Sequence, residues 1–135
     1  MDSTTLLRMG FREWKPFKLG VERVAPENKG VYAFRARENV GLIRGSSDLV
    51  YIGRAMSDRK GPYHNLRHSL REYLHPGRSQ GTKIRIHNAA LAKGYEVSWM
   101  TANEPDQLEC QLLRAFYTDH GQLPPENRAW PPGCA

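Results

Sequence analysis

The chain has 135 residues, of which 39% are hydrophobic and 25% charged, and its formal net charge is +6. This composition suits one globular domain with a modest core and excludes a fully disordered or fibrous chain. No stretch approaches the ~20 apolar residues of a membrane span, and the first residues lack the pattern of a signal peptide, so no membrane partner is expected. Cys110 and Cys134 are expected to be free thiols in a reducing compartment, which predicts a cytoplasmic protein.

Positive charge is concentrated in the middle of the chain. Residues 54–93 contain nine Lys and Arg against two Asp and Glu, together with four of the five histidines. The net charge is +3 over residues 1–53 and −4 over residues 94–135, so the whole excess belongs to the middle segment. A basic segment as local as this is typical of a protein that binds nucleic acid. The alternative is a solvated basic surface without a partner.

Residues 1–24 show no clean periodicity and are expected to form an N-terminal extension that packs on the core. Within this extension, Trp14, Phe17 and Leu19 are candidates for packing on the body of the domain. Residues 1–8 are expected to be loose, as chain ends commonly are.

Two strands are predicted next. The turn Asn28-Lys29-Gly30 is followed by strand formers over residues 31–37, and residues 49–52 form a second short run that Gly53 ends. Residues 41–48 are expected to form the loop between the two strands. Because this link is short, antiparallel pairing is expected.

Helical patterns dominate the second half of the chain. Proline at position 62 is expected to begin a helix that ends at Pro76-Gly77. Residues 82–93 favour a further helix, although its start also fits a strand. A third strand is predicted over residues 96–101 and a last helix over residues 105–120.

The element order is therefore ββααβα, which predicts an α+β domain: a small three-stranded antiparallel sheet flanked by helices. The core domain is expected to span residues 25–128, and residues 129–135 form a C-terminal tail.

Glu109 is unusual within the last predicted helix. At ~100° per residue, it falls between Leu113 and Phe116, inside the apolar stripe of that helix. Burial of an unpaired charge is costly, so a divalent cation or an arginine is expected to meet this carboxylate. The alternative is a first-turn glutamate that favours the helix dipole and points outward.

Two tyrosines form a second candidate group. Tyr32 and Tyr51 lie in the two predicted strands, within Gly30-Val31-Tyr32 and Tyr51-Ile52-Gly53. A strand tyrosine is usually a packing residue with a polar tip. Glycines beside both of them indicate that a substrate backbone approaches closely, which favours a functional role.

This set of motifs resembles the GIY-YIG nuclease family. The ordered elements are Gly30-Val31-Tyr32, Tyr51-Ile52-Gly53, an Arg-rich helix, Glu109-Cys110-Gln111-Leu112-Leu113 and Pro124-Pro125-Glu126-Asn127. The resemblance covers most of the chain, from about Gly30 to Asn127. It implies an endonuclease that hydrolyses a DNA phosphodiester with one divalent metal, Mg²⁺ or Mn²⁺, in each active site, and a role in DNA repair or restriction.

The resemblance also implies roles for single residues. Glu109 matches the helix glutamate that binds the metal, Tyr32 the tyrosine that takes a proton from the attacking water, and Tyr51 the tyrosine that positions water or phosphate. Arg54 matches a basic residue that helps to position these groups, and Asn127 an asparagine that orders the site or contacts the DNA backbone. A metal and cations offset the charge that builds on the phosphate, and a tyrosine of pKa ~10 needs such help to act as a base.

One position departs from the family pattern. The family helix carries an arginine, then an aliphatic residue, with a tyrosine or histidine four positions after the arginine. The apolar phase of the present helix makes Leu70 the aliphatic residue and Tyr73 the aromatic one. Ser69 then stands where arginine is expected.

Two explanations for Ser69 stay open. Arg71 and His75 restore the spacing but break the apolar phase, and Arg67 lies on the same flank as Arg71. Either one of these arginines, or Arg54 or Arg59, takes over the role, or the activity is reduced.

Basic residues around the middle of the chain are expected to contact DNA. The candidates are Arg59, Lys60, His75, Arg78, Lys83, Arg85 and Asn127. The polar loop over residues 76–82 leads into a helix start, whose free N–H groups suit a phosphate without reading bases, although a plain connection is the alternative. His64, His68 and His75 share one helix face at a spacing that zinc accepts, but neighbouring arginines favour a solvated or DNA-facing surface.

The leading hypothesis is a metal-dependent DNA endonuclease. One alternative is a nucleic-acid-binding module on the same scaffold whose catalysis has weakened, and another is a structural protein whose basic segment meets an acidic protein partner. The sequence does not reveal the DNA specificity. A domain of this size could act on a DNA shape, form a homodimer or depend on a protein partner.

Overall fold

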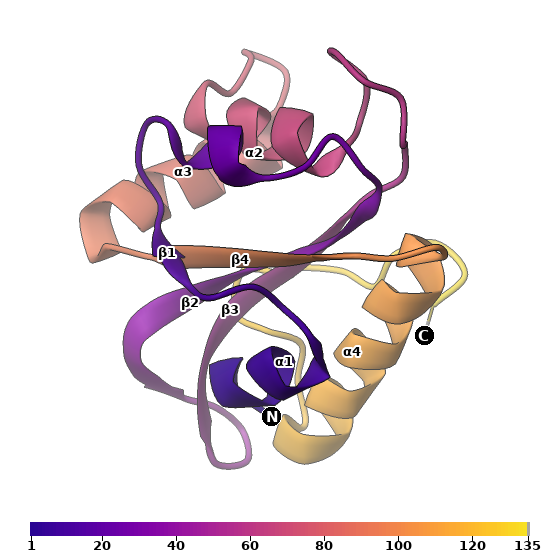
Figure 1. Cartoon of the computed structure of the whole chain (residues 1–135). Coiled ribbons are helices and arrows are strands. Elements are labelled where there is room, and N and C mark those ends of the chain that lie inside the picture. The colour runs from indigo at the N-terminus through magenta and orange to yellow at the C-terminus, as the bar shows by residue number, and fades with distance from the viewer. Residues whose placement is uncertain (135) are drawn as a thin grey trace.

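The computed structural model describes residues 1–134 and contains one four-stranded antiparallel sheet with helices on both faces (Figure 1). Strand β2 (Gly30–Gly41) lies between β3 (Ser46–Ala55) and β4 (Glu96–Thr101), and β1 (Lys15–Pro16) pairs with the outer side of β4. The α+β class is confirmed, but the prediction of three strands is wrong. Strand β1 has two residues, one of them a proline, so it carries no strand pattern that the sequence could reveal.

Four α-helices and one 3₁₀ helix surround this sheet. They are α1 (Ser3–Met9), the 3₁₀ helix η1 (Val21–Val24), α2 (Leu66–Leu74), α3 (Gly81–Lys93) and α4 (Pro105–His120). Helices α2 and α3 cover one face of the sheet together with η1, whereas α1 and α4 cover the other face (Figure 1). From β2 onward the order is the predicted ββααβα. No helix within residues 1–134 is long and apolar enough to cross a membrane.

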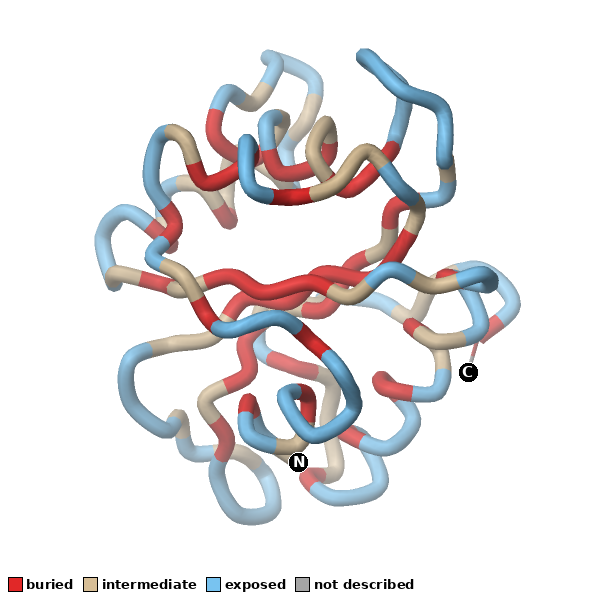
Figure 2. Tube along the Cα trace, in the orientation of Figure 1, coloured by how far each residue is buried: buried red, intermediate tan, exposed pale blue. Residues whose placement is uncertain are grey.

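The core has two halves, one on each face of the sheet. Alternation along β2 turns Tyr32 and Phe34 toward α2 and α3, and Val31 and Ala33 toward α1 and α4. Figure 2 shows the resulting band of buried residues along the sheet, between exposed helix surfaces. Because β2 is central, both of its faces are buried, which explains why it is an almost continuous apolar run up to Phe34.

A β-bulge in β3 sets the direction of Tyr51. Phe34 pairs with Tyr51 and Arg35 with Leu49, so Val50 is the extra residue of the bulge. The bulge lets Leu49 pack on the α4 face while Tyr51 packs with Tyr32 and Phe34 on the α2 face.

The N-terminal residues are more ordered than predicted. The expectation that residues 1–8 are loose is wrong, because Ser3–Met9 form α1, whose first turn is capped by the Asp2 side chain. Leu6 from α1 is fully buried, as are most of Trp14 and Phe17. Leu19 remains 73% exposed, which corrects the expectation that it packs on the body.

The ends of several elements differ from the prediction. Strands β2 and β3 take up half of the predicted loop 41–48, so only residues 42–45 join them. Helix α2 begins after Asn65 rather than at Pro62, because the Asn65 side chain accepts a hydrogen bond from the main chain of His68 and caps the helix. Helix α3 is a helix from Gly81, which excludes the alternative strand.

The prediction of free thiols is wrong, because Cys110 and Cys134 form a disulfide. The C-terminal segment folds back along β3 and α4, and this brings together two cysteines that are 24 residues apart in sequence. The cytoplasmic location was predicted from reduced cysteines, so it no longer follows once the two cysteines form a disulfide.

Candidate active site

An open cavity of about 410 Å³ lies where the edge strand β3 meets α2, α3, α4 and the C-terminal segment. It is lined by Tyr32, Tyr51, Gly53, Arg54, Tyr73, Thr82, Lys83, Glu109, Asn127, Ala129 and Pro131. The tyrosines come from the α2 face of the sheet and Glu109 from the opposite face. The two sets meet here because β3 is an edge strand, with no further strand to separate them.

Glycine at position 53 allows Tyr32 to reach this cavity. Tyr32 and Gly53 are partners in the β2–β3 register, and a Cβ atom on Gly53 would lie 2.6 to 2.7 Å from the Tyr32 ring and hydroxyl. The phenol therefore crosses β3 directly over the glycine. The space beside Gly30 is likewise occupied by the protein itself, because a Cβ atom on Gly30 would lie 2.2 Å from the Met100 carbonyl oxygen. We expected these two glycines to let a substrate backbone approach. In the structure, the space beside each of them is taken up by neighbouring atoms of the protein.

Tyr32, Tyr51 and Tyr73 together form the aromatic wall of the cavity. The ring centroid of Tyr73 lies 5.5 Å from that of Tyr32 and 6.1 Å from that of Tyr51. The hydroxyls of Tyr32 and Tyr73 share a hydrogen bond of 3.0 Å. Burial raises the pKa of all three phenols, and by a large amount for Tyr32 and Tyr73. A phenol in this cavity can therefore ionise near neutral pH to the phenolate, the form that accepts a proton, only when further positive charge enters.

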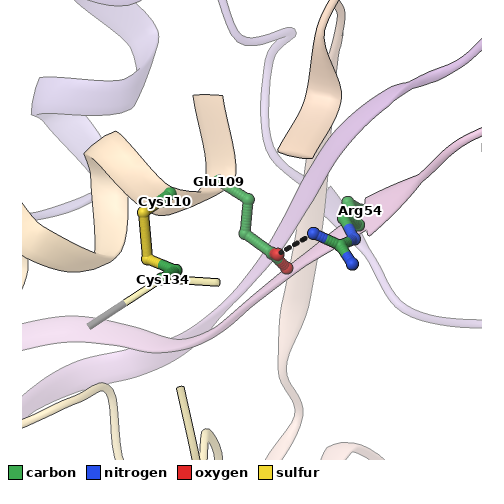
Figure 3. Close-up of a disulfide and its surroundings, with 4 residues drawn as sticks. All are labelled: Arg54, Glu109, Cys110 and Cys134. Carbon is green, nitrogen blue, oxygen red and sulfur yellow. Dashed lines mark ion pairs between the residues drawn. A yellow bond between two sulfur atoms is a disulfide. The ribbon is translucent and has the colours of Figure 1, made fainter. Parts of the chain in front are cut away.

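Glu109 is buried in α4 and faces Arg54 on β3. The two side chains point toward each other, with Arg54 Nη1 3.6 Å from Glu109 Oε1 (Figure 3). This distance is too long for a hydrogen bond, and Oε1 has no hydrogen-bond partner among residues 1–134. Burial raises the pKa of Glu109 to about 7, and the Arg54 charge opposes this only in part.

The unsatisfied Glu109 oxygen fits a divalent cation. Glu109 is the only acidic residue that lines the cavity in the part of the chain that the structure describes. Mg²⁺ is commonly held by one or two carboxylates and completed by water and substrate phosphates. The site therefore suits a cation that binds together with a phosphate ligand. Within residues 1–134, His64, His68 and His75 do not form a group of three side chains that could hold a metal ion.

Asn127 holds the C-terminal segment against β3. Its side chain donates to the Ile52 carbonyl oxygen and accepts from the Ile52 N–H, and both bonds are 2.9 Å long. The Glu126 N–H adds a third bond, to the Val50 carbonyl oxygen. Both hydrogen-bonding ends of the Asn127 amide are thus engaged with Ile52, which lies between Tyr51 and Gly53. This geometry fits an ordering role rather than a DNA contact.

Two predicted DNA contacts on α3 differ in their surroundings. Lys83 lines the cavity, and its Nζ lies 5.5 Å from the Tyr73 ring centroid. Arg85 instead forms an ion pair with the Glu126 carboxylate and donates to the Glu126 carbonyl oxygen at 3.0 Å. Arg85 therefore fixes the C-terminal segment beside Tyr51, whereas Lys83 is the α3 cation that faces the Tyr73 ring.

Other predicted residues lie elsewhere. Arg67 donates to the Ala25 and Arg23 carbonyl oxygens and faces the N-terminal extension, and neither Arg67 nor Arg71 belongs to the residues found to line the cavity within residues 1–134. Both lie on a different face of α2 from Tyr73. The remaining predicted DNA contacts are exposed on loops or helix ends outside the cavity, namely Arg59, Lys60, His75 and Arg78.

Some residues around the cavity carried no recognisable signal in the sequence. Ala129 and Pro131 line it only because the C-terminal segment packs there, whereas Thr82 belongs to the loop over residues 76–82 that was expected to contact a phosphate. Glu72 and Glu126 act indirectly, since each pairs with a basic residue of α3.

The chain was compared with models of protein families, with curated proteins and with solved structures, and none of them matches. Any functional assignment therefore rests on the residues of the cavity.

Proposed function

We propose that this chain is a GIY-YIG-type endonuclease that hydrolyses a phosphodiester bond of DNA with one divalent cation. The observation that carries the proposal is the buried, unsatisfied carboxylate oxygen of Glu109 in the cavity that Tyr32 and Tyr51 also line. Burial of such a group without a partner is costly, so a cation at this point has a physical reason to bind.

The divalent cation, Mg²⁺ or Mn²⁺, would be held by Glu109 and would supply Lewis-acid stabilisation of the phosphate and acidify the attacking water. Tyr32 first loses its own phenolic proton to solvent, and the resulting phenolate then takes the proton of that water and returns to the neutral phenol. The Tyr73 hydroxyl, 3.0 Å from that of Tyr32, can donate a hydrogen bond to this phenolate before the transfer. Tyr51, on the adjacent strand, orients the water or the phosphate.

Arg54 adds a second positive charge beside the reacting phosphate. It is held near Glu109 at 3.6 Å and is about one-third exposed, so it can turn toward a ligand without leaving the site. The charge that develops on the phosphate oxygens is then balanced by preorganised groups rather than by bulk water.

The test is DNA nicking by the wild-type chain and by Glu109→Gln, with and without Mg²⁺. Supercoiled, linear and branched DNA serve as substrates, so that the assay covers different DNA shapes. We expect metal-dependent nicking by the wild type and a loss of at least about 100-fold in the variant, with DNA binding retained. The matched control is Glu38→Gln, an exposed glutamate of β2, which is expected to nick at the wild-type rate. Equal nicking by Glu109→Gln and the wild type would reject the proposal.

A second candidate is a nucleic-acid-binding module without catalysis. The observation that favours it is Ser69, which is buried on α2 where the GIY-YIG pattern has an arginine. This candidate also predicts salt-sensitive DNA binding, but no product in any metal. The same nicking assay therefore separates the two functions.

A further inference from the structure

Lys83 is the residue of α3 that reaches the tyrosine wall. It lies in the first turn of α3, where Gln80, the residue before the helix, provides no side-chain cap. Its Nζ lies 5.5 Å from the centroid of the Tyr73 ring, and its side chain is about one-fifth exposed. An ammonium group is thus present on the opposite side of the cavity from the Glu109–Arg54 pair.

Glu72 on α2 holds this ammonium group in place. Lys83 Nζ donates to Glu72 Oε1 at 2.7 Å, and Gln80 Nε2 donates to Glu72 Oε2 at 2.6 Å. Although burial raises the pKa of Glu72, the hydrogen bonds from Lys83 and Gln80 outweigh it and lower that pKa overall. Glu72 therefore stays ionised and fixes the lysine.

The ion pair leaves Lys83 able to bind a ligand. A lysine ammonium group has three N–H donors, and Glu72 accepts one of them. The cavity is open, so the other donors face a volume that a phosphate group can enter. The first turn of α3 adds its positive dipole end at the same wall.

The other cations near the tyrosines are engaged in different ways. Arg85 is bound through both the side chain and the main chain of Glu126. Arg54 faces Glu109 on the far side of the cavity. On α2, Ser69 offers no charge. Lys83 is therefore the cation placed to meet a phosphate on the Tyr73 side.

We propose that Lys83 contacts a phosphate oxygen of the nucleic-acid strand in this cavity, and that Glu72 is the positioning residue that holds it there. This inference rests on the proposed function. On this inference, Lys83 of α3 supplies the positive charge that an arginine would supply at the position of Ser69 on α2.

The test uses Lys83→Gln and Lys83→Arg in the full chain, with Lys93→Gln as the matched control. Lys93 is an exposed lysine at the opposite end of the same helix. In nicking assays with Mg²⁺, we expect Lys83→Gln to lower kcat by about 10- to 100-fold, Lys83→Arg to recover most of that loss, and Lys93→Gln to match the wild type. Thermal unfolding of each variant shows whether the fold is kept.

Binding of a fluorescent DNA oligonucleotide, measured in EDTA, separates this inference from the proposed function. We expect Lys83→Gln to weaken binding by about tenfold and to reduce the salt dependence of log Kd by about one phosphate contact. Glu72→Gln is expected to lower kcat without weakening binding, because the Lys83 ammonium group is still present but no longer fixed by an ion pair. If Lys83→Gln binds DNA with the wild-type Kd and salt dependence, the inference is wrong, whether or not the wild type cleaves DNA. If the wild type binds through Lys83 but never nicks, the proposed function fails and the inferred contact stands.

Discussion

The side chain of Asn127 pairs with the main chain of Ile52 as a neighbouring strand would, through one donated and one accepted hydrogen bond. Ile52 lies on the outer edge of β3, between a tyrosine and a glycine of the cavity. The pair therefore closes an edge strand and fixes the C-terminal wall of the candidate site at once.

Replacement of Asn127 by alanine removes both bonds and leaves the Ile52 N–H and carbonyl oxygen without these partners. We expect Asn127→Ala to lower the free energy of unfolding by about 1–3 kcal/mol. Urea denaturation measures this change. Asn88→Ala, on the exposed surface of α3, is the control and is expected to stay within about 0.5 kcal/mol of the wild type. A wild-type unfolding midpoint for Asn127→Ala would show that the pairing contributes nothing to stability.

A methyl group on Gly53 would overlap the phenol of Tyr32. Because the Cβ would lie 2.6 to 2.7 Å from that ring, the ring or the strand must move. We expect Gly53→Ala to cost about 1–3 kcal/mol of stability and to reduce nicking, since Tyr32 leaves its place beside Tyr73. Gly41→Ala is the matched control at the far end of β2, where a Cβ meets nothing within 4 Å. Similar losses in both variants would mean that backbone freedom, and not the ring contact, explains the glycine.

The sequence predicted the parts of the site that depend on local pattern. The helical wheel of α4 placed Glu109 within the apolar stripe, and the residue is indeed 5% exposed. Strand β4 and helix α4 have the predicted bounds because an alternating run and a helix closed by Gly121 are local signals.

Contacts between distant segments could not be predicted in this way. The Asn127–Ile52 pair and the Cys110–Cys134 bond depend on the path of a C-terminal segment that has no periodicity. The position of Lys83 depends on how α3 packs against α2, which no pattern within α3 encodes. For the same reason, the sequence did not decide whether Arg67 or Arg71 takes the place of the family arginine. Neither is among the residues found to line the cavity within residues 1–134.

The disulfide attaches the end of the C-terminal segment to α4, one residue after Glu109 (Figure 3). Closing a loop of 24 residues is worth about 3 kcal/mol in the chain-entropy account. We expect reduction, or Cys134→Ser, to lower stability by roughly this amount and to free the residues after Asn127, whose own bonds to β3 persist.

Trypsin cleavage after Arg128 reports this release. Arg128 is exposed and lies between the Asn127 anchor and the disulfide. Cleavage is expected to accelerate in the reduced protein and in Cys134→Ser, and to be slow in the oxidised wild type. Equal cleavage rates in oxidised and reduced protein would show that other contacts, such as the packing of Trp130 on Tyr117, are sufficient to hold the segment.

The raised pKa of Glu109 makes stability depend on pH. A glutamate in the unfolded chain titrates near 4.5, whereas burial raises the pKa of Glu109 to about 7 in the folded protein. The folded state therefore binds this proton more tightly, so the contribution of Glu109 to stability is greatest below pH 4.5 and falls as the pH rises toward 7. The loss is at most about 3 kcal/mol.

Glu109→Gln removes this titration while keeping the shape of the side chain. We expect the variant to match the wild type near pH 4.5 and to exceed its stability by about 2–3 kcal/mol near pH 8, although the same variant is expected to lose nicking activity. Millimolar Mg²⁺ should raise the unfolding midpoint of the wild type near pH 8 and leave that of Glu109→Gln unchanged, because only the carboxylate can hold the cation. Parallel pH profiles for the two proteins would show that Glu109 is not strained in the folded state, and an equal response to Mg²⁺ would place the cation elsewhere.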